Sequence, residues 1–104
     1  MENMTLFDQE TLRRFSRHVT VAHHVPGRVR FKFNPTIVKE VGEEAINEMK
    51  TFDKRLKGIR EVKLNKLARS VTITYDKSVL EPAFFEGLAA GTVPADLADL
   101  IIQP

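Results

Sequence analysis

The sequence predicts a single α+β domain with the element order strand, helix, strand, strand, helix. Three patterns support this order. Apolar and charged residues alternate from position 28 to 33, an apolar stripe with helical spacing follows Pro35, and two β-rich runs precede a second apolar helix. A chain of 104 residues has room for one hydrophobic core, so we expect one domain.

Composition narrows the class of protein. The chain is 42% hydrophobic and 29% charged, as in ordinary globular domains. Its 16 Lys and Arg against 14 Asp and Glu leave a net charge of only +2, which does not indicate strong nucleic-acid binding. The chain has no cysteine, which excludes disulfides, thiolate nucleophiles and cysteine-based metal sites. Without an apolar run of about 20 residues or a secretory signal, we expect a cytoplasmic location.

Residues 1–18 are expected to form an N-terminal arm with a short helix. Asp8 stands where a helix N-cap would be, and Leu12 and Phe15 share one helical face. We expect this arm to pack on the domain or to fray. The alternative is a basic amphipathic helix that docks on a partner or makes peripheral contact with a membrane.

The first strand has two chemically opposite faces. The apolar face carries Val29, Phe31 and Phe33, and the charged face carries Arg28, Arg30 and Lys32. This alternation is typical of a strand with one face in a core and one in water. Val19 and Val21 indicate that extended chain begins earlier. The Pro26-Gly27 pair therefore marks either a kink in one long strand or a turn between two.

One helix is expected after Asn34-Pro35, because proline cannot continue the strand ladder. Its apolar positions recur at intervals of three and four residues. They are Val38, Val41, Ala45, Met49, Phe52 and Leu56. Gly58 then ends the helix as a left-handed C-terminal cap.

A hairpin and a second helix follow. The segments 59–64 and 70–75 read as two strands joined by a polar turn. Ser78 to Glu81 has the spacing of a capping box, which predicts a helix that starts at Ser78 and has Pro82 in its first turn. Gly87 or Gly91 ends this helix.

This order is that of a split βαβ repeat, which predicts a ferredoxin-like sandwich: an antiparallel sheet with two helices on one face, assigned to residues 19–91. A fourth strand would complete the repeat. Residues 92–104 form either a helix, from the spacing of Leu97, Leu100 and Ile101, or a short edge strand. A missing fourth strand would leave an open edge for a terminal arm, a partner strand or a second subunit, so a homodimer is plausible.

Three segments together resemble a known family. They read His24-Val25-Pro26-Gly27-Arg28-Val29-Arg30-Phe31 at the first strand, Gly58-Ile59-Arg60-Glu61-Val62-Lys63-Leu64-Asn65 at the second and Ser70-Val71-Thr72-Ile73-Thr74-Tyr75-Asp76 at the third. From position 23 to 91 the chain resembles cysteine-less heavy-metal-associated-like domains, which occur alone or at the N-termini of bacterial metal-transporting P-type ATPases. The resemblance implies a ferredoxin-like fold and a role in metal homeostasis, without implying a known ligand.

The chain departs from the metal-carrying members of this kind of domain. Those members hold a soft ion with two cysteines in the loop after the first strand. The corresponding loop here is Asn34-Pro35-Thr36, which has no sulfur. Any ion would therefore need imidazole, carboxylate or thioether donors.

His23 and His24 are the candidate metal ligands, since neutral imidazole binds transition metals and haem iron. Adjacent residues on a regular strand point to opposite faces, so both bind one ion only if the Pro26-Gly27 segment twists them together. The alternative is that one histidine is buried and hydrogen-bonded while the other is solvated, with His18 nearby.

Arg28, Arg30 and Lys32 are the candidate partner-binding residues, with Arg69 or Lys63 joining them from neighbouring strands. Nucleic acid is not the favoured partner, because ferredoxin-like sheets stack bases on exposed aromatic residues and the aromatic residues here have the buried parity. A solvated face without a ligand is the alternative. No phosphate loop, nucleophile or zinc motif is present, so we do not expect an enzyme.

These observations favour a non-catalytic binding or regulatory module related to metal homeostasis. We expect it to act through protein contacts of its first strand, with a protein partner or a second copy. The alternative is a small carrier that binds a transition metal or haem through His23 or His24.

Overall fold

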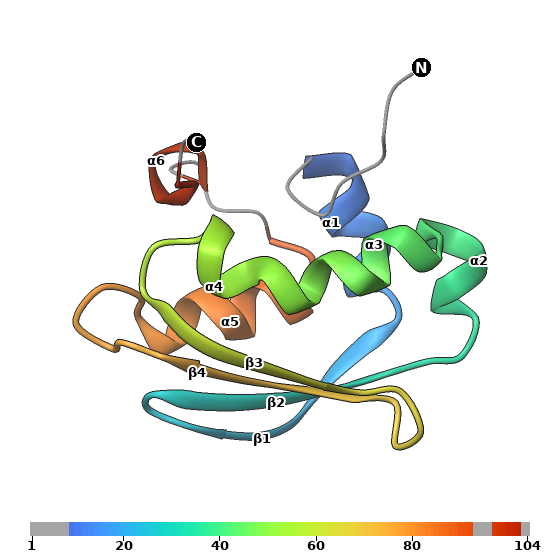
Figure 1. Ribbon diagram of the computed structural model, residues 1–104, viewed down its shortest axis with the longest axis horizontal. Helices are drawn as coiled ribbons and strands as arrows, with labels where there is room; N and C mark the ends of the chain where they lie inside the picture. Colours follow the sequence, from blue (N-terminus) through green and yellow to red (C-terminus); the bar gives the residue numbers. More distant parts are fainter. Residues whose placement is uncertain (1–8, 93–96, 103–104) are drawn as a thin grey trace.

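The computed structural model describes residues 9–92 and 97–102 and shows a four-stranded antiparallel sheet with its helices on one side (Figure 1). The strands are β1 (Val19–Val25), β2 (Arg28–Phe33), β3 (Ile59–Asn65) and β4 (Ser70–Tyr75). The helices are α1 (Gln9–Ser16), α2 (Ile37–Val41), α3 (Glu43–Glu48), the 3-10 turn η1 (Met49–Thr51), α4 (Phe52–Arg55), α5 (Pro82–Ala89) and α6 (Leu97–Leu100). The expected α+β sandwich is confirmed.

The fourth strand comes from the start of the domain. Pro26-Gly27 forms a turn between β1 and β2, so the segment from Val19 to Phe33 makes two strands rather than one kinked strand. The sheet order is β1-β2-β4-β3, with every neighbouring pair antiparallel. β1 thus occupies the edge beside β2, where a ferredoxin-like repeat would place its last strand.

The end of the chain adds a helix instead of a strand. The helix α6 is followed by an isolated bridge between Ile101 and Leu56. Of the two expectations for this segment, the helix is the one that the structure shows. None of the described helices is long and apolar enough to cross a membrane.

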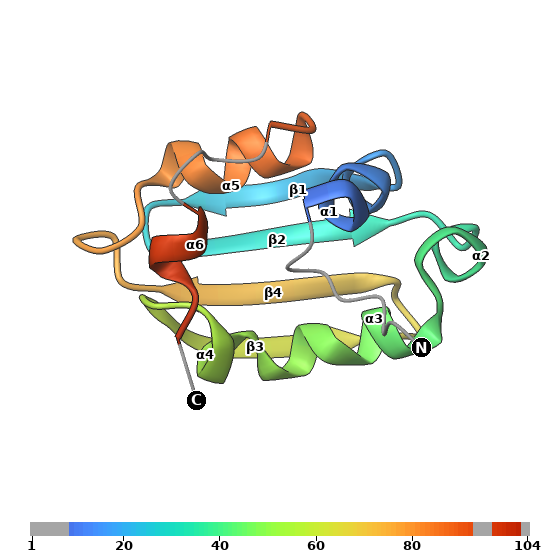
Figure 2. The ribbon, with the colours of Figure 1, turned by 90° about the horizontal axis from the view of Figure 1, so that it is seen from above.

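The predicted alternation along β2 is confirmed. Val29 and Phe31 are buried and Phe33 is half-buried, whereas the three charged residues between them are exposed. β2 lies between β1 and β4, so its apolar side chains reach the centre of the core beneath the helices. Figure 2 shows this arrangement from the helical side, with α5 along β1, α3 along β3, and β2 and β4 between them.

The expectation of one continuous helix after Pro35 was wrong. The segment divides into α2, α3, η1 and α4, and the first break falls at Gly42. Gly42 has φ 85° and ψ 154°, a conformation that only glycine adopts without strain. The break resets the helical phase, so Val38 is 43% exposed while Ile37 is fully buried. Beyond it, Ile46, Met49, Phe52 and Leu56 face the core.

The second long helix starts later than the capping-box spacing predicted. α5 begins at Pro82, and the hydroxyl of Ser78 donates to the carboxylate of Asp76 instead of capping a helix. This bond, together with the Ser78 amide and then Arg60, lowers the pKa of Asp76. After the cap residue Ala90 comes Gly91, which has a positive φ as expected at a helix end.

The N-terminal helix packs on the domain. α1 lies against α2, α5 and β1, and Phe15 packs on the edge of the core. For residues 9–18, the part of the arm that the structure describes, this agrees with packing rather than fraying. Asp8, the expected cap, lies outside the described residues.

The close approach at Gly58 yields a stability prediction. A methyl group there would lie 2.9 Å from the Val79 side chain, and φ is 91°. At Gly42 the φ is 85° but a methyl group would meet nothing within 4 Å. We therefore expect Gly42→Ala to cost about 1–3 kcal/mol from backbone strain alone, and Gly58→Ala to cost about 2–6 kcal/mol, because overpacking adds about 1–3 kcal/mol to the strain.

Urea denaturation followed by circular dichroism measures both free energies of unfolding. Equal losses of unfolding free energy in the two variants would show that the close approach of Gly58 to Val79 and Leu80 adds nothing to the cost of the Gly58→Ala substitution.

Candidate functional site

One face of the sheet carries no described helix and forms the candidate site, which we call the open face (Figure 1). Strand register places its residues in rows. His23, Arg30, Thr72 and Lys63 form one row across all four strands. Val25, Arg28, Thr74 and Glu61 form the next row. Strands lie about 4.8 Å apart, so each row spans roughly 15 Å.

The open face is basic. Arg28, Arg30, Lys32 and Lys63 are all exposed, and none of the four forms an ion pair with a residue that the structure describes. A polar hollow of about 330 Å³ lies on this face. It is lined by Arg28, Glu61, Lys63, Thr72 and Thr74. Unpaired cations beside threonine hydroxyls form a surface that can bind carboxylate or phosphate oxygens.

The structure brings together most of the residues that the sequence singled out. Arg28, Arg30 and Lys32 lie side by side on β2, and Lys63 joins them from β3. Arg69 does not join them, because it lies in the turn before β4 and lines a separate hollow with Phe33 and Val38. Sequence reasoning did not single out Glu61. Glu61 precedes Lys63 by two residues on β3, so it lies on the same face, in the row of Arg28 and Thr74.

Phe, Tyr and Trp side chains are absent from the residues placed on the open face by register, and the His23 imidazole lies on the edge strand β1. Phe31 and Tyr75 are buried beneath the helices, at 5% and 3% exposure. Base stacking on a sheet needs exposed rings on the central strands. The open face therefore offers charge and hydroxyl groups without a stacking platform.

A β-bulge decides where the two histidines lie. Val21 pairs with Phe31 and His23 with Arg30, so Ala22 is an extra residue in β1. The bulge reverses the alternation, because Val19 and Val21 face inward but the next inward residue is His24. His23 is exposed beside Arg30 on the open face. The two imidazoles thus lie on opposite faces of the sheet.

His24 is held beneath α5 by two hydrogen bonds. Its side chain is 9% exposed. Nδ1 lies 2.5 Å from Glu86 Oε2 and Nε2 lies 2.7 Å from Tyr75 Oη. A carboxylate can only accept a hydrogen bond, so Nδ1 donates to Glu86, while Nε2 shares a hydrogen bond with the Tyr75 hydroxyl. The bonds tie β1 to β4 and α5.

The histidines do not converge on an ion. No group of three or more His, Cys, Asp or Glu side chains in the described parts of the chain has a geometry that could hold a metal. A metal on His24 would have to displace Tyr75 or Glu86. His18, which we expected near the pair, instead lies 3.3 Å from the hydroxyl of Thr36. The metal role of His23 and His24 stays a prediction.

The loop after β2 has a donor set that does not suit a soft metal ion. Thr36 donates from its amide and its hydroxyl to Asn34 Oδ1, each at 2.9 Å. The loop supplies hard oxygen atoms that already bond to one another, and it has no thiolate. The residues present at this position therefore do not fit copper(I) or a similar cargo.

Comparison with known proteins gives one finding. The model of a family described as heavy metal associated domain 2 matches residues 12–94, most of the 104-residue chain. No curated protein and no solved structure matches the chain significantly.

His24 yields the first prediction from the site. His24→Ala removes the partner of the buried Tyr75 hydroxyl, so we expect it to lower the free energy of unfolding by about 2 kcal/mol. His23→Ala is the matched control and should change it by less than about 0.5 kcal/mol, because His23 is exposed. Urea denaturation of both variants measures this difference. Equal effects would contradict the structural role of His24.

Metal titration yields the second prediction. Both ring nitrogens of His24 have protein partners, and His23 belongs to no group of three metal-ligating side chains among the described residues. We therefore expect the heat of zinc or nickel binding to be the same in the wild type and in His23→Ala/His24→Gln. Glutamine keeps a polar group near Tyr75. Isothermal calorimetry measures the heats, and absorbance with added haem extends the test to iron. Weaker binding in the double variant would restore the carrier interpretation.

Proposed function

The chain belongs to the heavy metal associated domain 2 family, and on that premise we propose that it is a non-catalytic binding module of metal homeostasis that engages an acidic protein surface through its open face. The family relates the chain to heavy metals. The open face supplies the means of contact. We place this function in the cytoplasm, as the sequence led us to expect.

The observation that carries the proposal is the set of exposed cations on the open face. Arg28, Arg30 and Lys63 lie on two strands separated only by β4, so their charges act on one partner surface. Within the described residues they have no carboxylate partners. Other exposed bases do have partners: Arg60 pairs with Asp76 and Lys66 with Glu43. The open face thus keeps its positive charge available.

A protein partner fits this face better than RNA does. The face is basic and carries threonine hydroxyls, and its described residues on the central strands β2 and β4 include no aromatic ring on which a base could stack. Carboxylates of a partner can form bidentate pairs with Arg28 and Arg30, which project from the same side of β2. Acidic side chains are therefore the proposed ligands.

A non-catalytic role is supported by the chemistry of the site. The open face offers cations, hydroxyl groups and Glu61, and among the described residues no hydrogen bond joins the hydroxyl of Thr72 or Thr74 to a carboxylate or an imidazole. His24 points to the other side of the sheet and is hydrogen-bonded there. We expect binding without turnover.

Self-association through the open face is opposed by its own charge, because two copies would bring like charges together. A homodimer, if it forms, is better served by the edge strands β1 and β3. Multi-angle light scattering over a range of concentrations tests the dimer. A strict monomer at high concentration would argue against it.

Charge reversal tests the proposed function. The probe is a fluorescein-labelled peptide of alternating glutamate and alanine. We expect Arg30→Glu/Lys32→Glu to weaken its binding about tenfold or more at low salt, because two contact charges become repulsive. Fluorescence anisotropy measures the affinity.

The matched control is Lys54→Glu/Lys57→Glu, which makes the same charge change at exposed positions outside the sheet's open face. Equal weakening by both pairs would mean that only net charge matters and would contradict the proposal. Tighter binding of single-stranded RNA or of phosphatidylserine vesicles than of the peptide would assign the face to those ligands instead.

A further inference from the structure

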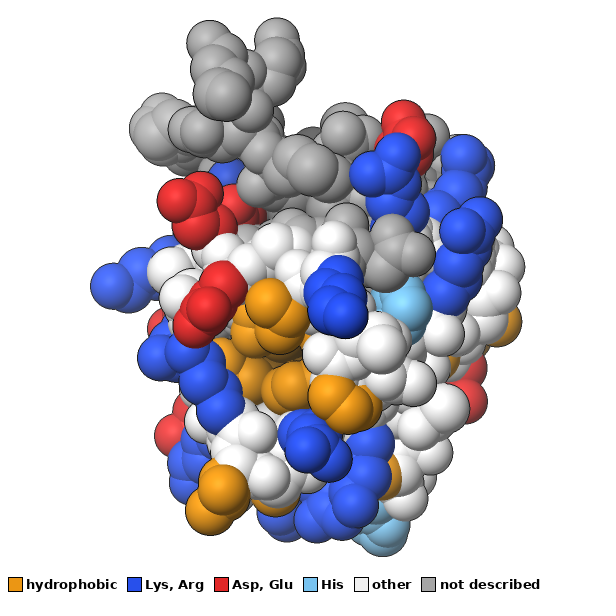
Figure 3. All heavy atoms as spheres, turned by 90° about the vertical axis from the view of Figure 1, so that its right-hand side faces the viewer, with side chains coloured by type: hydrophobic (Ala, Val, Ile, Leu, Met, Phe, Trp, Pro, Cys, Tyr) orange, Lys and Arg blue, Asp and Glu red, His pale blue; other side chains and the backbone are white. Residues whose placement is uncertain are grey.

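A second surface lies at the end of the domain where β2 gives way to α2. It is a hollow of about 200 Å³ between α2 and the β3–β4 turn, which we call the hairpin-end groove. Phe33, Val38 and Ile46 form part of its apolar lining, and Lys66 and Arg69 line it from the turn. Figure 3 views this end of the molecule and shows hydrophobic side chains in a hollow with lysine and arginine side chains around it.

The apolar side chains in the groove are only partly covered by the core. Phe33 is only half-buried and Val38 is 43% exposed, because Gly42 interrupts the helix and turns Val38 outward. Leu67, next to Lys66 in the turn, is 97% exposed. Large apolar side chains gathered at one exposed place mark an interaction site more often than isolated ones do.

The backbone of Arg69 is strained. Its φ is 54°, and among the described residues it is the non-glycine residue with a positive φ. The Arg69 carbonyl accepts a hydrogen bond from the Phe33 amide at 2.9 Å, which joins the turn to the wall of the groove. Glycine would adopt this conformation without strain. Replacing Arg69 with glycine would remove this backbone strain. The presence of arginine at a strained position therefore suggests that its side chain has a function.

Charge gives the groove its specificity. Lys66 is paired with Glu43 at 3.7 Å across the rim. Arg69 has no ion-pair partner among the residues that the structure describes, so its guanidinium stands free beside an apolar lining. The volume is below the roughly 300–1,000 Å³ of small-molecule pockets and suits one large side chain.

We propose that the hairpin-end groove docks an acidic linear segment of a partner protein, with one aliphatic or aromatic side chain against Phe33 and Val38 and a neighbouring carboxylate paired with Arg69. The site is separate from the open face. It differs from that face in chemistry, because it requires an apolar anchor as well as negative charge.

The test uses two labelled peptides. One carries a central Leu-Phe pair flanked by glutamates, and the other has alanines in place of the pair. We expect the Leu-Phe peptide to bind the wild type about tenfold more tightly, from burial of its apolar side chains. Val38→Glu and Arg69→Gly should each remove most of this advantage in fluorescence anisotropy.

Arg69→Gly separates binding from folding. Because glycine relieves the positive φ, we expect the midpoint of thermal unfolding to stay the same or to rise while the peptide preference falls. Arg30→Glu/Lys32→Glu changes the open face and should weaken binding of both peptides, because both carry glutamates, while the Leu-Phe peptide keeps its advantage over the alanine peptide. This control keeps failure of the groove distinct from failure of the proposed function.

Three outcomes would overturn the proposal. The first is equal binding of the two peptides, or a preference that survives both groove variants. The second is binding that appears only after removal of residues 1–8, which would assign the groove to the chain's own start. The third is a concentration-dependent dimer that Val38→Glu abolishes, which would assign it to a second copy.

Discussion

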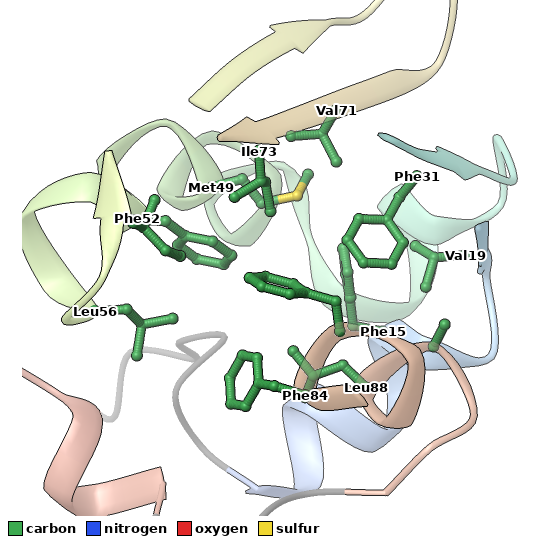
Figure 4. Close-up of a pocket in the computed structure, with 13 residues that line it drawn as sticks. Phe15, Val19, Phe31, Met49, Phe52, Leu56, Val71, Ile73, Phe84 and Leu88 are labelled. Carbon is green, nitrogen blue, oxygen red and sulfur yellow. The ribbon is translucent and has the colours of Figure 1, made fainter. Parts of the chain in front are cut away.

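The two-faced strand β2 is the constraint on which the rest of the structure depends. Its apolar side chains must be covered, so the helices gather on one side of the sheet. The core encloses an apolar hollow of about 40 Å³. Figure 4 shows Phe31, Met49, Phe52 and Phe84 among the side chains that line it. Its charged side chains must stay in water, so the opposite side has no helix among the described residues. The core and the basic face are therefore two consequences of one alternating segment.

Alternation along β2 and along β4 was sufficient to predict the sheet, its buried face and the basic residues of the open face. The features that were missed depend on single residues. The extra residue Ala22 reverses the parity of β1, and Gly42 resets the phase of the helix. Neither has a periodic signature, because a bulge and a positive φ are set by contacts with partner segments. The source of the fourth strand was missed because Pro26-Gly27 allowed both a kink and a turn.

The family's description suggests a metal site, but the loop after β2 and the two histidines do not form one among the described residues. The loop after β2 has no thiolate, and the better buried histidine is committed to Tyr75 and Glu86. In place of a metal site in that loop, the chain has two candidate binding surfaces. They are the basic open face and, at the end of the sheet, the hairpin-end groove beside Arg69. For this reason the function that we propose is contact with a partner rather than carriage of an ion in that loop.

Nuclear magnetic resonance tests the central claim most directly, by titrating ¹⁵N-labelled protein with an acidic peptide and following the amide and arginine side-chain signals. The account predicts that the largest shifts fall on Arg28, Arg30, Thr72 and Lys63, in rows across adjacent strands, while Phe52 and Phe85 in the core stay unchanged. Shifts confined to the helices, or none on β2, would contradict it.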